Sequence, residues 1–457
     1  MEVIAKTLAQ FAAGTKYEDL PGDIVQCAKE RIIDILSAAM AGASLWEYRN
    51  GIIDTSRNMG DSGYSTIMGR KETASFPAAA AINCAYAHSM ELDDGHRNAG
   101  AHAGAVVIPT ALSLAEKLNI DGRHVILGVV IGYDVAYRFA RSMSPLLIEN
   151  GFHPSAVCGT MGAAAVSASL LRLNACQAAK ALSLSALFAS GLMEITHSGQ
   201  SSKGAMVGHA AFAGIYSAIM AKNGFSAPEA SFSGMSGLFK AMSDNNVDAA
   251  KMLEGLGENY EIKDTYVKLY PTCRHTHAPI EGTVALCSEH NIMAEEVQRI
   301  DIGTHPVAFN LTGAAGAPCD IQQARFSTPY CVASALINGT FGIVDLKEEN
   351  INDDRRAQLS SLIHVYVDKE VASEFPKKRG AKIRIELKNG TAFEKTIYNL
   401  KGAPELPVGY MDLCDKFKNM AQVSLSEENI RKICGNVQNF EKLAELSAFM
   451  RLLKSTN

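Results

Sequence analysis

Apolar residues recur at three- and four-residue spacing through the first part of the chain, from residue 2 to about residue 260. Such spacing is typical of amphipathic helices, so the pattern predicts that this part is helical throughout. One such stripe consists of Ile24, Cys27, Ala28, Ile32, Ile33, Leu36 and Met40. Further helices, rich in Ala, Gly and Ser, are expected over 76–90, 105–118, 124–143, 155–171, 176–191 and 204–223. Small residues allow helices to pack closely, so the pattern indicates a large bundle.

Strand patterns begin near residue 260. Apolar residues lie among polar ones around Val297, Ile300 and Ile302, and the stretch from Ile363 to Asp368 alternates in the same way. The stretch from Lys382 to Tyr398 contains an Asn-Gly pair at 389–390, which tolerates the positive φ angles of a tight turn. The sequence therefore predicts a second domain of mixed α and β structure that includes one hairpin.

The helical pattern returns after Gly402 and Pro404, from Tyr410 to Leu453, and Ser424 and Glu427 have the spacing of a capping box. We therefore expect the end of the chain to rejoin the first domain. A length of 457 residues fits two domains. The predicted fold is mainly α with an α+β second domain: an all-helical bundle of residues 1–265 and 405–457, and a smaller α/β domain of residues 266–404.

Composition narrows the class of protein. The net charge of −5 is spread along the chain without a basic block, which argues against nucleic acid as a partner. The hydrophobic content of 47% and the charged content of 20% are typical of a soluble globular protein. The ten cysteines are scattered without a CxxC pair, as expected for free thiols in a reducing cytoplasm, and this spacing does not suggest an iron–sulfur cluster.

Targeting and membrane signals are weak. The N-terminal residues include acidic and polar side chains where a signal peptide needs a continuous apolar run, so we expect no export. The uncharged stretch from Pro154 to Leu171 is interrupted by small and polar residues, which favours a buried helix over a membrane span. We expect a cytoplasmic protein without a membrane partner.

The run from His88 to Gly104 lies between two alanine-rich apolar segments and is the first candidate site. Its ionisable residues are His88, Glu91, Asp93, Asp94, His96, Arg97 and His102. Carboxylates beside imidazoles can supply general acids and bases, because burial and like charge move their pKa values towards neutrality. The alternative is an acidic helix end with surface histidines.

Two further candidates precede predicted helices. His153 lies just ahead of an apolar helix, where its ring can face a cavity, although a solvated loop histidine fits the same pattern. Lys203 lies close to a helix N-terminus, where the helix dipole disfavours a cation unless an anion is bound. Lys203 is therefore a candidate carboxylate ligand, and a surface lysine is the alternative.

The fourth cluster lies where the helical pattern gives way to the mixed domain. It comprises Lys268, Cys273, Arg274, His275 and His277. A metal site or a thiol nucleophile at Cys273 is a weaker interpretation, because zinc needs three or four assembled ligands and the sequence does not identify the rest. Arg325 offers a further anion ligand, and its alternative is a helix-start motif.

These clusters occur together in a known pattern. Six segments follow one another in the order of one family: HSMELDDGH, GYDVAYR, the stretch from Gly151 to Ala165, SGQSSKG, VKLYPTCRHTH and ARFSTPY. Over essentially its whole length the chain resembles the MmgE/PrpD family, which includes 2-methylcitrate dehydratases, cis-aconitate decarboxylases and an iminodisuccinate epimerase. The resemblance implies a helical domain built from both chain ends, a smaller inserted α/β domain, and a homodimer.

The resemblance also implies a site between the two domains, formed by Asp93, His102, His153, Lys203, Lys268 and His277. Substrate-binding roles are expected for Asp94, His96, Cys273, Arg274, His275 and Arg325. In this interpretation Lys203, Lys268 and Arg325 hold carboxylates, and Asp93, His102 and His153 share proton transfers. Where the decarboxylase branch has a histidine this chain has Cys273, with His275 two residues further on, which makes decarboxylation less expected.

The chemistry common to this family forms a carbanion or enolate next to a carboxylate. We expect a lyase that needs no metal or other cofactor and removes water from a small hydroxy di- or tricarboxylate. An epimerase that acts on an iminodisuccinate-like acid and a cis-aconitate-type decarboxylase are the enzymatic alternatives. A carboxylate-binding protein that keeps the pocket without catalysis is the alternative from another class.

Overall fold

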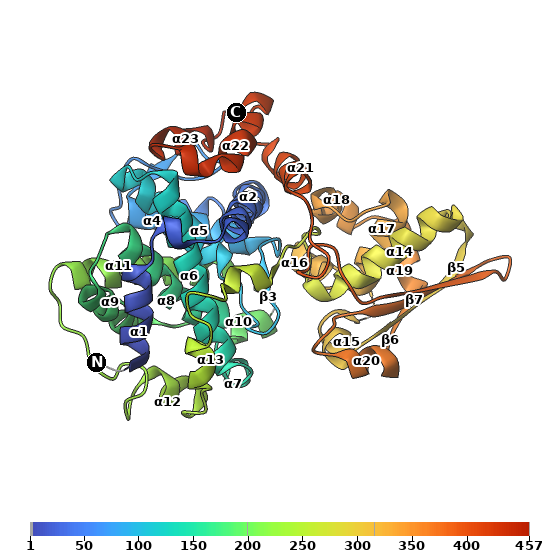
Figure 1. The fold of residues 1–457 in the computed structure, drawn as a ribbon. Helices are drawn as coiled ribbons and strands as arrows, with labels where there is room; N and C mark the ends of the chain where they lie inside the picture. The colour runs from blue at the N-terminus through green and yellow to red at the C-terminus, as the bar shows by residue number, and fades with distance from the viewer. Residues whose placement is uncertain (1–2, 199, 315, 457) are drawn as a thin grey trace. The chain divides into compact units, whose positions relative to one another are not determined.

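The computed structural model describes residues 3–198, 200–314 and 316–456. The chain divides into two compact units, one formed by Met1–Val267 with Gly409–Asn457 and the other by Lys268–Val408. Unit 1 is helical apart from two pairs of two-residue strands, and unit 2 contains a four-stranded sheet with helices. The predicted fold class, mainly α with an α+β second domain, is therefore confirmed (Figure 1).

Unit 1 contains the predicted bundle. Its helices are α1 (Val3–Gly14), α2 (Gly22–Leu45), α3 (Gly51–Asn58), α4 (Phe76–Ser89), α5 (Gly104–Leu118), α6 (Gly122–Met143), α7 (Leu146–Glu149), α8 (Pro154–Leu170), α9 (Ala175–Phe188), α10 (Glu194–His197), α11 (Lys203–Lys222), α12 (Leu238–Ser243), α13 (Ala249–Leu253), α21 (Tyr410–Ala421), α22 (Glu427–Gln438) and α23 (Ser447–Leu452). The six helices that the small-residue pattern predicted correspond to α4, α5, α6, α8, α9 and α11, with ends that differ by up to three residues.

The prediction that the first part is helical throughout is wrong in one respect. Short strands β1 (Ser65–Thr66) and β2 (Thr73–Ala74) pair with each other, and β3 (Gly95–His96) pairs with β4 (Thr265–Tyr266). Two-residue strands are too short to produce a recognisable alternation. The β3–β4 pair also places residues 265–267 in unit 1, so the first boundary falls after Val267.

Small residues bring the helices of the bundle into close contact, as the sequence predicted. A Cβ atom added at Gly208 of α11 would lie 2.5 Å from the Ala81 carbonyl oxygen of α4, which is too close for any side chain. Helix α8 is buried along nearly its whole length, in agreement with the buried helix expected there. These contacts hold α11 closely against α4 and enclose α8 in the bundle.

Helix α11 is, within the part of the chain that the structure describes, the one helix long and apolar enough to cross a membrane by length and composition. Buried residues make up 61% of its most apolar window. A core helix passes the same test, and α11 packs against α4, α8 and α9.

The end of the chain returns to the helices of unit 1, as expected from its pattern. Figure 1 shows α21 and α22, in red, beside α2, in blue, and these helices are in contact. The buried Lys416 of α21 forms an ion pair with Asp34 of α2. The predicted capping box is wrong: Ser426, not Ser424, is the residue before α22, and its hydroxyl accepts from the backbone N–H of Asn429.

Unit 2 is a sheet covered by helices. The strands are β5 (Val297–Thr304), β6 (Ile363–Val367), β7 (Ala381–Leu387) and β8 (Ala392–Ile397). Their order is β6-β5-β7-β8, with β5 and β6 parallel and the other neighbours antiparallel. The helices are α14 (His277–His290), α15 (Pro306–Thr312), α16 (Ile321–Arg325), α17 (Thr328–Asn338), α18 (Glu348–Ile351), α19 (Asp354–Ser361) and α20 (Lys369–Glu374).

The core of unit 2 lies between the sheet and helices α14, α17 and α19. Ile300 and Ile302 of β5 are fully buried beside Ile385 and Ile383 of β7. The predicted hairpin is confirmed as β7 and β8, and Gly390 in its turn has φ of 85°. The alternation read from the sequence therefore identified the buried face of this sheet.

Candidate active site

The candidate site of unit 1 is built on the segment that joins α4 to α5. His88 lies in the last turn of α4, and the connecting residues 90–103 carry β3, which pairs with β4. His153 is the residue just before α8, where its backbone N–H donates to the Gly191 carbonyl oxygen at 3.0 Å. Helix ends and one short strand pair therefore position the ionisable side chains.

Two histidines approach one carboxylate, and a third histidine lies beside them. His88 Nδ1 lies 2.7 Å from Asp93 Oδ2, and His102 Nδ1 lies 3.6 Å from the same oxygen. The ring centroid of His88 lies 5.5 Å from that of His102 and 5.5 Å from that of His153. The predicted residues Asp93, His102 and His153 thus come together in unit 1, and His88 lies between the two other imidazoles.

His102 is held by the main chain as well. Its Nδ1 lies within hydrogen-bond distance of the Asp94 carbonyl oxygen, and its backbone N–H donates to Ser155 Oγ at 3.0 Å. The side chain of His102 is 19% exposed, whereas that of His88 is 1% exposed. His102 is therefore the more accessible of these two imidazoles.

Burial is the main reason why the pKa of His153 lies well below its ordinary value. The nearby His88, Lys203 and His102 lower this pKa further, and Glu91 opposes them. His153 is thus neutral near pH 7. A neutral imidazole can accept a proton, which is the first requirement for a general base.

The anion that Lys203 pairs with in the structure is a carboxylate of the protein itself. Its ammonium forms an ion pair with Glu91, and the two side chains are only 13% and 8% exposed. Lys203 is the first residue of α11, and Glu91 has the left-handed φ of 53°. The sequence correctly predicted Lys203 at a helix N-terminus but missed Glu91 as its partner.

The carboxyl group of Asp94 is bound to helix α6. Its Oδ2 accepts a hydrogen bond of 2.8 Å from the Tyr133 hydroxyl. Burial, helped by the nearby Asp34 and opposed by Arg31, raises the pKa of Asp94 to about 7. Asp94 is therefore a buried carboxyl that titrates near neutral pH.

His96 lies in a different cluster from His102 and His153. Its Nε2 lies 3.3 Å from Glu261 Oε2, and its ring lies 4.8 Å from that of Tyr137. Both His96 and Glu261 are buried. The structure therefore places the His96 side chain against Glu261 and Tyr137, beside the β3–β4 pair.

The GYDVAYR segment of α6 is structural. Arg138 is fully buried, and its Nε donates to Asp134 at 2.9 Å. Its other nitrogens donate to the carbonyl oxygens of Met252, Glu254 and Asn259. This arginine therefore fixes the segment that leads to β4.

The second cluster lies in unit 2. Lys268 and His277 are buried, and Arg274 Nη1 lies 3.0 Å from His277 Nδ1. Arg274 also donates to the Lys401 carbonyl oxygen at 3.2 Å. Since arginine can only donate, His277 Nδ1 accepts this bond, and the Nε2 of a neutral ring then carries the hydrogen.

The remaining predicted residues of unit 2 lie around this cluster. The backbone N–H of Cys273 donates to the Arg325 carbonyl oxygen at 3.0 Å, which joins two predicted segments. Arg325 is buried, and its guanidinium donates to Gln322. The ring of His275 lies 5.0 Å from that of His305, and burial, then Arg379, lowers the pKa of His275 well below its ordinary value.

The sequence raised a metal site and a thiol nucleophile at Cys273 as weaker interpretations. Among the described residues no group of three or more His, Cys, Asp or Glu side chains is arranged to hold a metal ion. All ten cysteines are free thiols, as expected. Cys273 is buried, and its predicted neighbours His275 and His277 face His305 and Arg274.

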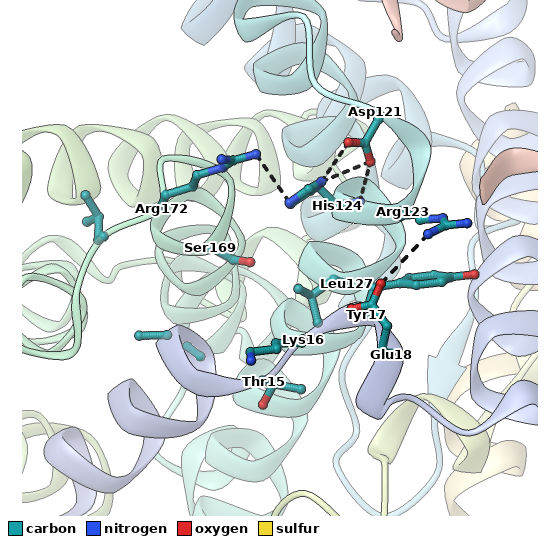
Figure 2. Close-up of a pocket in the computed structure, with 13 residues that line it drawn as sticks. Thr15, Lys16, Tyr17, Glu18, Asp121, Arg123, His124, Leu127, Ser169 and Arg172 are labelled. Atoms are coloured by element: carbon teal, nitrogen blue, oxygen red, sulfur yellow. Dashed lines mark hydrogen bonds and ion pairs between the residues drawn. The ribbon is translucent and has the colours of Figure 1, made fainter. Parts of the chain in front are cut away.

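A separate cavity of about 490 Å³ lies at the end of α1, the start of α6 and the end of α8 (Figure 2). Within it His124 Nδ1 lies 2.8 Å from Asp121 Oδ2, and Arg172 lies 3.3 Å from His124 Nε2. The His124 side chain is 42% exposed. This cavity contains none of the predicted site residues, but it holds an aspartate–histidine pair much like that of Asp93 and His88.

Comparisons with known proteins cover nearly the whole chain. Residues 6–250 match the family model of the MmgE/PrpD N-terminal domain, and residues 270–439 match that of the MmgE/PrpD C-terminal domain. The cis-aconitate decarboxylase of Aspergillus terreus is 23% identical and aligns over 98% of this chain and 96% of its own length. Those of Mus musculus and Homo sapiens are each 24% identical over 99% of this chain, and over 94% and 95% of their own lengths.

Proposed function

The chain belongs to the MmgE/PrpD family, and from this we propose that it is a lyase that removes water from a small hydroxy di- or tricarboxylate. The observation that carries the proposal is the group formed by the buried Asp93 and His153 and the partly exposed His102, next to the Lys203–Glu91 ion pair. Such a group can move protons beside a cation that attracts carboxylates. Enzymes of this family act as lyases or related isomerases, which fits that chemistry.

The first step of the proposed reaction breaks a C–H bond next to a carboxylate. The neutral ring of His153 accepts the proton, and the electron pair remains on the carbon as an enolate. The hydroxyl on the neighbouring carbon then leaves with a proton supplied by an acid of the site. One proton and one hydroxide leave the substrate, so the product is an alkene and water.

Cationic groups stabilise the negative charge that develops in this step. We assign this role to Lys203 in unit 1 and to Lys268 and Arg325 in unit 2, all of which are at least largely buried. Because Lys203 is already paired with Glu91, a substrate carboxylate competes with Glu91 for the ammonium. His277, which is paired with Arg274, is assigned to the proton chemistry of unit 2.

Decarboxylation is the second candidate, because the three relatives named above are cis-aconitate decarboxylases. This reaction breaks a C–C bond, releases carbon dioxide and protonates the carbanion, so it uses the same cations and acids. Against it stands the resemblance described from the sequence, which implies that Cys273 takes the place of a histidine of the decarboxylase branch. An epimerase would return the proton to the opposite face and eliminate nothing.

Proton NMR in deuterated buffer with a chelator tests these reactions. The substrates are citrate, 2-methylcitrate, isocitrate, cis-aconitate and malate-like and iminodisuccinate-like acids. An alkene signal that grows with loss of water supports the dehydratase, and loss of carbon dioxide from cis-aconitate supports the decarboxylase. Deuterium at an α-carbon without elimination supports the epimerase, and binding without turnover supports a carboxylate-binding protein. Activity lost in the chelator would contradict a metal-independent reaction.

The role of His153 can be tested by substitution. His153→Ala is expected to leave the protein folded and to lower turnover by ~10²-fold or more, because the substrate proton then has no acceptor. Turnover is measured by NMR, and folding by circular dichroism. Near-normal turnover would remove His153 from the mechanism.

We also propose a homodimer in the cytoplasm that binds neither nucleic acid nor membranes. The exposed rings of Phe188, Phe212 and Tyr216 on α9 and α11, with centroids 5.8 and 6.2 Å apart, form an apolar surface that a second copy would cover. Light scattering of the purified protein tests the dimer. A monomer at all concentrations would contradict it.

A further inference from the structure

His88 has no role in the mechanism given so far, yet it lies at the centre of the histidine group. Its ring is 1% exposed and lies 5.5 Å from the rings of both His102 and His153. The shortest polar contact that its ring makes is the 2.7 Å approach of Nδ1 to Asp93 Oδ2. His88 therefore lies beside both of the other histidine rings and is itself held by a carboxylate.

The contact with Asp93 determines how the His88 ring carries its hydrogen. An ionised carboxylate can only accept hydrogen bonds, so Nδ1 of His88 is the donor. In the neutral ring the lone pair then lies on Nε2. Asp93 thus orients the ring so that its basic nitrogen is directed away from the carboxylate.

This Nε2 is buried and, among the residues that the structure describes, has no hydrogen-bond partner. The Nδ1 of His153 is buried and unpartnered in the same way. A buried polar atom without a partner costs about 1–3 kcal/mol. Two such nitrogens on adjacent rings are therefore expected where a proton or a polar ligand atom is received during function.

We propose that His88 is a proton relay and that Asp93 is its positioning residue. The proposal rests on the proposed function, in which His153 takes the substrate proton. Because neither Nδ1 of His153 nor Nε2 of His88 has a hydrogen-bond partner among the described residues, the relay step runs through a bridging water molecule: the N–H bond on His153 breaks, the water takes up this proton and releases another, and an N–H bond forms at His88 Nε2. His88 becomes an imidazolium whose charge Asp93 balances, and His153 is again a neutral base. The reverse transfer supplies the proton for the leaving hydroxyl.

The exposed pair in Figure 2 shows what distinguishes His88 from an ordinary aspartate–histidine contact. His124 lies 2.8 Å from Asp121, but its Nε2 faces Arg172 and its side chain is 42% exposed. His88 makes the same kind of contact, but it is buried and has two further histidine rings beside it. His124 therefore serves as the matched control.

The test replaces His88 by Asn, whose side-chain amide can still donate to Asp93 but cannot take up a proton. The relay predicts that His88→Asn lowers kcat by ~10²-fold or more on the acid that the wild type converts, with KM little changed. The pH profile of kcat should also lose one limb. His124→Asn should leave both kcat and the profile unchanged.

A purely structural role for His88 would leave His88→Asn active with the wild-type pH profile, and that result overturns the relay. If His88→Asn does not fold, Asp93→Asn is used instead, because an amide facing Nδ1 favours the opposite tautomer and should also remove the limb. Nitrogen NMR of histidine-labelled wild type gives a readout that needs no turnover. Hydrogen on Nε2 of His88 would overturn the relay, whether or not an acid of the panel reacts. Failure of every acid to react would by itself count against the proposed function.

Discussion

Glu91 contributes both its backbone and its side chain to the candidate active site. Its φ of 53° lies in the left-handed region, which costs a residue with a Cβ about 1–2 kcal/mol. Such conformations persist where the surrounding structure requires them, often at functional sites. Here the turn directs the carboxylate to Lys203, so a strained residue decides the charge that a substrate would meet.

Glu91→Gln tests whether Lys203 is a carboxylate ligand. The substitution keeps the size of the side chain and removes the charge that competes for the ammonium. We expect a non-reactive tricarboxylate such as tricarballylate to bind roughly tenfold more tightly, a difference of about 1.4 kcal/mol. Calorimetry measures the change, and Glu194→Gln on the exposed face of α10 is the control. Weaker binding by Glu91→Gln would contradict this role of Lys203.

Asp94 should make stability depend on pH. Burial raises the pKa of Asp94 from its ordinary 3.8 to about 7, so between these values the folded state holds a proton that the unfolded state has released. Stability therefore falls as the pH rises through this window, by at most about 1.4 kcal/mol per pH unit. Urea unfolding from about pH 5 to about pH 8 should show a smaller fall for Asp94→Asn. An identical slope would contradict the raised pKa.

The residues of the site were predictable in part. The density of ionisable groups and the family resemblance identified Asp93, His102 and His153, which the structure brings together. The relation of Glu91 to Lys203 was not predictable, because it depends on a left-handed turn and on two segments distant in sequence. The sequence assigned His88 no role, although a histidine near a helix end and five residues before a carboxylate is a usable signal.

At the level of elements, the small residues of α11 determine how closely it approaches α4. Gly208→Ala gains about 1 kcal/mol in helix propensity, yet its methyl group would lie 2.5 Å from the Ala81 carbonyl oxygen. We expect a net loss of about 1–3 kcal/mol, because the helices must separate. Thermal unfolding measures the loss, and His209→Ala on the exposed side is the control. A more stable Gly208→Ala variant would show that α11 can shift freely.

The sequence predicted helices better than their connections. The six small-residue helices follow from a helical spacing of apolar residues that is maintained over many residues. Strands β3 and β4, in contrast, have two residues each and lie far apart in the sequence of unit 1. The cap of α22 shows the same limit. Both Ser424 and Ser426 are possible caps by residue type, and only the backbone geometry selects Ser426.

At the level of the whole molecule, the returning segment supplies a buried charge. Lys416 of α21 binds Asp34 and also donates to the Leu92 carbonyl oxygen at 2.9 Å, directly before Asp93. Lys416→Met should cost about 3–5 kcal/mol, because Asp34 would lose this buried partner. Lys418→Met removes an exposed pair with Glu427 and should cost less than about 1 kcal/mol. Equal losses in chemical unfolding would contradict this difference.

The contact between Lys416 and Leu92 also has a consequence for biosynthesis. The ribosome makes α2 and the 90–103 segment early and α21 only after all of unit 2, so Leu92 and Asp34 are made long before their lysine. Unit 2 is continuous in sequence and can fold as it emerges, whereas unit 1 must wait with part of its interior incomplete. A nascent chain that stalls within unit 2 would therefore lack the contact between Lys416 and Leu92, next to Asp93. Catalytic competence would be acquired only after α21 is translated.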